Sequence, residues 1–67
     1  MNKTNIIKNY LKQGNSISDS KAVELCNNYR LSSTIHELRH RHNMNIQDRW
    51  VEQENGYKFK EYYLLEV

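Results

Sequence analysis

Apolar residues near the start of the chain recur with the spacing of a single helix face. These positions are Ile6, Ile7, Tyr10 and Leu11. Asn2 or Thr4 offers a side-chain oxygen that suits the start of a helix, and Gly14 suits the left-handed position after a helix end. The pattern therefore predicts a first helix that ends at a turn over residues 13–16.

A second, short helix is predicted next. Ile17 stands alone between polar residues, which indicates a strand stub of about one or two residues. Ser18 or Asp19 is a suitable cap for a helix that runs to about Cys26, with Ile17 placed to pack against its first turn. The inward positions of this helix are Ala22, Leu25 and Cys26.

An asparagine pair separates the second helix from a third. Asn27 and Asn28 end the second helix because asparagine tolerates the left-handed conformation, and Asn28 is also suited to cap the helix that follows. The third helix is predicted from Tyr29 or Arg30 to about His42. Its apolar stripe consists of Leu31, Ile35 and Leu38. Short helices joined by a tight turn are typical of a helix-turn-helix.

The periodicity changes to that of strands over residues 45–53 and 57–67, and the Asn-Gly dipeptide between them favours a hairpin. A two-residue turn would pair Ile46 with Leu65 and Trp50 with Glu61. A three-residue loop with Gly56 left-handed would pair Ile46 with Leu64, Asp48 with Tyr62, and Val51 with Phe59. We prefer the second register, because it places Ile46, Tyr62 and Leu64 on one face. Trp50 then lies opposite Lys60. We expect its side chain in the core, with a dimer contact or an anchor for a binding partner as the alternatives.

Length and charge limit the functions available to this chain. Its 67 residues predict one domain over 1–67, with an α+β fold and little room for a deep catalytic cleft. The net charge of +2 permits nucleic-acid binding without requiring it. The single cysteine, Cys26, excludes a disulfide framework. The sequence shows neither a signal peptide nor a membrane-spanning stretch, so we expect a cytoplasmic protein with no membrane partner.

His36-Glu37-Leu38-Arg39-His40 matches the HExxH pattern of zinc proteases. Such enzymes need a third protein ligand and an open coordination position. The two histidines share a helix face, but that face points away from the apolar stripe and toward solvent. His42 lies too near the stripe to be the third ligand. We therefore expect no enzyme, no catalytic residue, no cofactor and no metal site, with incidental metal capture by the histidine pair as the alternative.

The polar face of the third helix has two interpretations. Most charged helix faces are simply solvated. The functional interpretation is a recognition helix in the DNA major groove, with short serines near phosphate and longer side chains at base edges. Glu37 would oppose this role unless it accepts from a cytosine amine. The candidate residues on the helix are Arg30, Ser32, Ser33, His36, Arg39 and His40.

The hairpin adds Lys58 and Lys60, which are suited to contact the phosphate backbone or the minor groove. Glu52 and Glu54 lie at the same tip and weaken that positive field. An ordinary solvated hairpin is the alternative.

The chain resembles a family of small winged helix-turn-helix domains of bacteriophages and prophages. The resemblance covers nearly the whole chain and rests on YLKQGNSI (10–17), AVEL (22–25), YRLS (29–32), IHELR (35–39), NI (45–46), WV (50–51), ENG (54–56) and YYLL (62–65). It implies three helices followed by a C-terminal hairpin wing, and DNA binding inferred from that fold. One departure is the turn His42-Asn43-Met44, where the family often has glycine, so the third helix is expected to run slightly longer.

These observations lead to two hypotheses. The first is a phage- or mobile-element-type protein that binds double-stranded DNA, acting as a transcriptional regulator or an excisionase-like factor in the cytoplasm of a bacterial host cell. The second is a protein-binding winged helix, a phage inhibitor of a host defence or host enzyme complex, since fold alone does not decide function. A homodimer is compatible with both.

Overall fold

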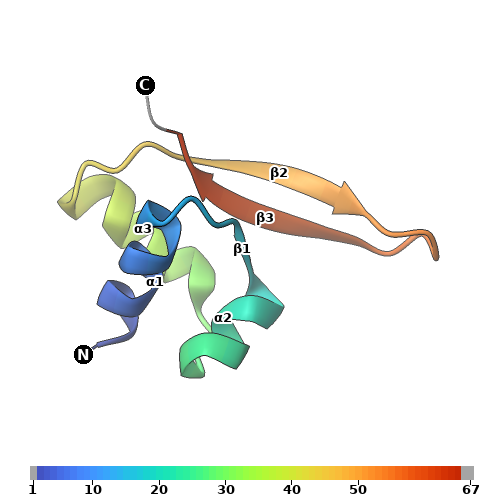
Figure 1. The fold of residues 1–67 in the computed structure, drawn as a ribbon, viewed down its shortest axis with the longest axis horizontal. Helices are drawn as coiled ribbons and strands as arrows, with labels where there is room; N and C mark the ends of the chain where they lie inside the picture. The colour runs from blue at the N-terminus through green and yellow to red at the C-terminus, as the bar shows by residue number, and fades with distance from the viewer. Residues whose placement is uncertain (1, 66–67) are drawn as a thin grey trace.

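The computed structural model describes residues 2–65, so Met1, Glu66 and Val67 of the predicted domain lie outside the described residues. The described elements are α1 (Lys3–Lys12), β1 (Ile17–Ser18), α2 (Asp19–Cys26), α3 (Leu31–Arg41), β2 (Ile46–Glu52) and β3 (Lys58–Leu64). The helices gather at one end of the molecule, and the β2–β3 hairpin extends well beyond them (Figure 1). The predicted order of helix, strand stub, helix, helix and hairpin is confirmed, and so is the α+β fold class.

The ends of α1 and the start of α2 form where the sequence predicts them, whereas α3 starts at Leu31, after the predicted Tyr29 or Arg30. The Asn2 side chain accepts a hydrogen bond from the Asn5 amide at 2.8 Å and caps α1. Gly14 follows that helix with φ +92°, a conformation in which a side chain is strained. The Ser18 hydroxyl accepts from the Lys21 amide at 3.3 Å and caps α2.

The third helix ends at Arg41, with His42 as its C-cap residue. Asn43 takes φ +51°, so an asparagine occupies the left-handed conformation that glycine usually supplies after a helix. The helix is therefore no longer than the pattern alone predicted. The expectation that the third helix runs slightly longer is wrong. Asn43 takes the place of the family's usual glycine, and the turn forms at the same point.

The hairpin adopts the preferred register. Ile46 pairs with Leu64, Asp48 with Tyr62, Trp50 with Lys60, and Val51 with Phe59. Gly56 has φ +84°, and its amide donates to the Gln53 carbonyl at 2.9 Å, which closes the loop. β1 pairs with the other side of β3, giving the strand order β1-β3-β2.

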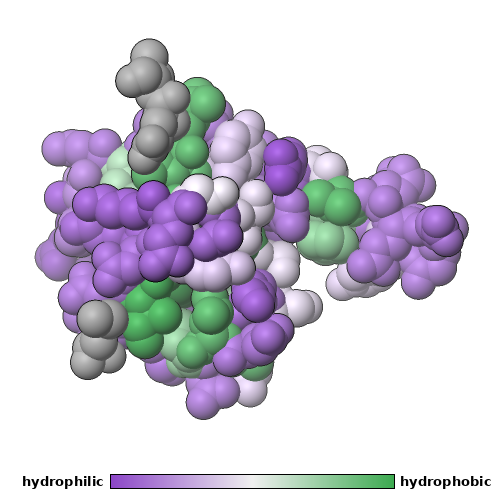
Figure 2. All heavy atoms as spheres, in the orientation of Figure 1, coloured by the Kyte–Doolittle hydropathy of each residue, from purple (hydrophilic) through white to green (hydrophobic). Residues whose placement is uncertain are grey.

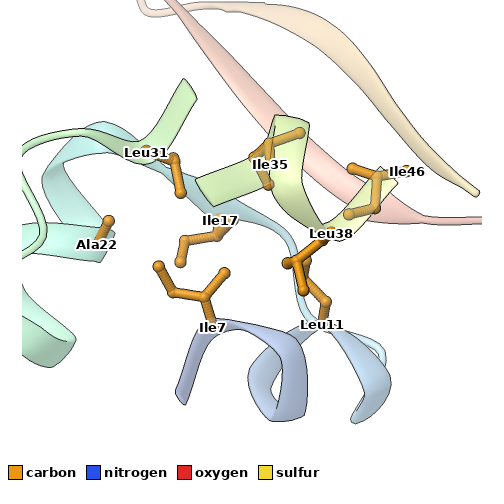
Figure 3. Close-up of a cluster of buried hydrophobic side chains, with 8 residues drawn as sticks. All are labelled: Ile7, Leu11, Ile17, Ala22, Leu31, Ile35, Leu38 and Ile46. Atoms are coloured by element: carbon orange, nitrogen blue, oxygen red, sulfur yellow. The ribbon is translucent and has the colours of Figure 1, made fainter. Parts of the chain in front are cut away.

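One apolar cluster holds the helices to the base of the hairpin (Figure 3). Its buried side chains are Ile7, Leu11, Ile17, Ala22, Leu31, Ile35, Leu38 and Ile46. Leu25, Cys26, Tyr62 and Leu64 are partly buried against it. The expectation that Trp50 lies in the core is wrong, because its side chain is 68% exposed. Ile46 is the last buried residue along β2, so the core ends before Trp50.

Candidate nucleic-acid interface

The solvent face of α3 is formed by short and medium-sized polar residues. Its apolar stripe faces the core, and Thr34 is buried beside that stripe. On the opposite side, four predicted site residues are all exposed: Ser32, Ser33, His36 and His40. The structure therefore brings these four residues together on one surface that a partner can reach.

The turn before α3 is fixed by a buried polar contact. The Asn28 side chain is 4% exposed, and its amide donates to the Thr34 hydroxyl at 2.8 Å. Its side-chain carbonyl oxygen accepts from the Arg30 amide at 2.8 Å. The prediction that Asn28 caps the third helix is wrong, because Arg30 is the N-cap residue of α3. Asn27 takes φ +54° and ends α2. These contacts hold the start of α3 at a fixed angle to α2, with Arg30 exposed beside it.

Arg30 is the N-cap residue of α3 and makes no side-chain capping hydrogen bond. The first amides of a helix have no partner within the helix, and together with the helix dipole they attract anions. The start of α3 therefore presents a cationic side chain, exposed serines and helix N–H groups in one place.

Arg39 is positioned differently from the other candidates. Its Nε donates to the Ile46 carbonyl oxygen at 3.0 Å, and its Nη2 lies 3.7 Å from the Asp48 carboxylate. The side chain is 37% exposed and is directed toward β2. The sequence grouped Arg39 with the base-reading residues, whereas the structure places it in a bridge between α3 and the hairpin.

The HExxH residues do not converge on a site. The His36 and His40 rings lie 4.2 Å apart on the exposed face. Glu37 is directed toward α1, where it accepts from the Thr4 hydroxyl at 3.0 Å and lies 3.7 Å from Arg41. Within residues 2–65, no three His, Cys, Asp or Glu side chains form a group able to hold a metal ion. The residues of the HExxH pattern therefore lie on two faces of α3, with the histidines toward solvent and Glu37 toward α1.

The predicted wing lysines lie on one face of the hairpin. Lys58 is exposed and lies opposite Glu52 in the strand register. The Lys60 ammonium lies 5.2 Å from the centre of the Trp50 ring. The structure keeps these lysines on the hairpin and away from the exposed face of α3, so the candidate residues form two separate surfaces.

Sequence reasoning did not single out two residues beside the start of α3. Tyr29 is 78% exposed, and Lys3 reaches from α1 to donate to the Asn27 carbonyl at 3.0 Å. Both line an open depression of about 490 Å³ next to Arg30 and Ser33. A tyrosine directly after a polar turn was the available signal, but its exposure depends on how the helices pack.

A helix-turn-helix followed by an exposed β-hairpin defines the class of small winged-helix proteins, a class that suggests DNA binding. A family model described as a winged helix-turn-helix domain matches residues 3–67, and the chain belongs to that family. Searches of curated proteins and of solved structures found no match. In the part of the chain that the structure describes, no helix is long and apolar enough to cross a membrane.

Proposed function

We propose that this protein binds double-stranded DNA with α3 in the major groove. The observation that carries the proposal is the exposed polar face of α3, which lies directly opposite the buried stripe. An α-helix with its side chains is about 10–12 Å across and fits a major groove about 12 Å wide. On this proposal His36 and His40 face base edges, and the serines lie near the backbone.

Contacts to phosphate come from both α3 and the hairpin. Arg30, Ser32 and the first amides of α3 are suited to bind one phosphate group. Lys58 and Lys60 on the hairpin are suited to the backbone farther along the duplex. Arg39 supports this arrangement from within, because it joins α3 to β2.

The role that fits best is a transcriptional regulator or an excisionase-like factor of a phage or mobile element, acting in the cytoplasm of a bacterial host. The support is the sequence resemblance together with the small size of the domain. A homodimer would present two α3 helices to two half-sites, as many helix-turn-helix proteins do.

The test is an electrophoretic mobility shift with random DNA and with DNA from upstream of the gene, at low and near-physiological salt. DNA binding predicts that affinity falls steeply as salt rises. Ser33→Glu places a carboxylate on the exposed face of α3 and should abolish the shift. Asn9→Glu adds the same charge to an exposed position of α1 and is the matched control. Equal affinity in the two variants would contradict the placement of α3.

A second candidate function, binding to a host defence or host enzyme complex, is favoured by exposed aromatic residues. Tyr29, Trp50 and Tyr57 are 78%, 68% and 59% exposed, and aromatic anchors are enriched where proteins bind one another. The low net charge of +2 agrees with this candidate. Absence of any DNA shift at low salt would favour it over DNA binding.

A further inference from the structure

We propose that Trp50 is a base-stacking residue that enters the minor groove next to the major groove occupied by α3. This inference rests on the proposed DNA binding and adds a second contact of a different kind. In it the hairpin supplies an aromatic ring that packs against a base step, in addition to any contact that its lysines make with phosphates.

The surroundings of Trp50 are those of a stacking site. The ring is 68% exposed, and the Lys60 ammonium lies 5.2 Å from its centre. Trp50, Glu52 and Lys58 line an open depression of about 370 Å³ on the hairpin. Surfaces that bind single-stranded nucleic acid combine such aromatic rings, which stack on bases, with cations that take the phosphates. Proteins that bind the minor groove of duplex DNA insert apolar side chains between base steps. Lys58 and Lys60 supply the positive charge on this face, which also carries Glu52 and Asp48.

The direction of the side chain agrees with this role. Side chains alternate along a strand, so Trp50 shares a hairpin face with Ile46 and Asp48. Ile46 is buried among the helices, and Asp48 lies 3.7 Å from Arg39 of α3. Trp50 therefore projects from the hairpin on the side that carries α3.

The length of the hairpin also agrees with a contact in the adjacent minor groove. Trp50 is four residues past Ile46, which corresponds to about 13 Å at roughly 3.3 Å per strand residue. Neighbouring major and minor grooves are separated by about half of a helical turn, or about 17 Å. In Figure 2 the hairpin stands clear of the body. A ring carried on this arm can reach the adjacent groove while α3 stays in the major groove.

A second copy of the chain is a weaker occupant of this surface. β2 is an edge strand, and edges are the usual route to strand pairing between copies. A two-fold pairing centred on β2 would place Arg49 opposite Arg49 of the other copy, and like charges directly opposed are destabilising. The nucleic-acid occupant therefore fits the charges better.

The test uses the fact that Trp50 is the only tryptophan in the chain. Short DNA duplexes are titrated into the wild-type protein, with the mobility shift and tryptophan emission measured on the same samples. Stacking predicts quenched emission that saturates together with the shift. Trp50→Ala should weaken binding by about tenfold or more, and Trp50→Phe should retain most of the affinity. Duplexes rich in TA steps should bind more tightly than A-tract duplexes, because TA steps open more easily.

Tyr57→Ala is the matched control. Tyr57 is 59% exposed and stacks on Phe59, on the other face of the hairpin. It should leave affinity unchanged. A normal shift without quenching, together with full affinity in Trp50→Ala, would overturn the role of Trp50 and leave the proposed DNA binding intact. Quenching by single-stranded DNA alone would overturn the groove placement. No shift with any DNA would overturn the proposed function itself.

Discussion

Arg39 and Ile46 are joined by a hydrogen bond of 3.0 Å from the guanidinium Nε to the backbone carbonyl, which ties α3 to the first residue of β2. The same guanidinium lies 3.7 Å from Asp48, two residues farther along the strand. Because both contacts involve the base of the hairpin, Arg39 sets the angle between α3 and the wing. It is a positioning residue for the proposed DNA surface.

We predict that Arg39→Met lowers the free energy of unfolding by about 1 kcal/mol, since the lost charged hydrogen bond is partly exposed. DNA affinity should fall by a similar factor on every sequence, because the geometry of the wing changes and no base contact is lost. Asp48→Asn should reduce binding in the same direction, and the effects of the two changes should not add. Urea unfolding and mobility shifts measure both quantities. An unchanged urea midpoint with relaxed specificity at a single base pair would show that Arg39 reads a base instead.

The helical body was predictable from sequence because its signals are local. Left-handed backbone positions follow from the chemistry of Asn27 and Gly14, and the short strand follows from the isolated Ile17. The hairpin register followed from Gly56 and from the need to keep Ile46 on the core face.

The positions of Arg39 and Trp50 were not predictable in the same way. Arg39 lies on the boundary of the α3 polar face, and only the packing of β2 against α3 turns its side chain inward. Trp50 lies four residues after Ile46 and on the same face of β2, so strand periodicity predicts that it is a core residue. Its exposure depends on where the helices stop covering the sheet, which is a tertiary feature that strand periodicity does not contain.

Leu38 should be among the most sensitive positions for stability. Its side chain is fully buried between the helices and the sheet, with 0% exposure. Leu38→Ala should cost about 2–5 kcal/mol, which is a large share of the stability of a domain this small. Leu65→Ala removes the same atoms from a side chain that is 45% exposed and should cost far less. Equal urea midpoints for the two variants would disprove the assigned phase of α3.

Glu37 should have no catalytic role. Its carboxylate accepts a hydrogen bond from Thr4, and the amide oxygen of Gln can accept the same bond. Glu37→Gln should therefore keep stability and partner binding within a few-fold of the wild type. Stoichiometric zinc in untagged protein, together with peptide cleavage that a chelator stops, would contradict this prediction.

Arg30 should contribute more to DNA binding than Lys58. Arg30 is exposed at the start of α3, where helix amides and serines surround it, whereas Lys58 lies opposite the acidic Glu52. Arg30→Ala should cost about 1–3 kcal/mol on a cognate site. Lys58→Ala should cause a smaller loss that is nearly uniform across sequences. Equal small losses at both positions, measured on the same duplexes, would count against a major-groove position for α3.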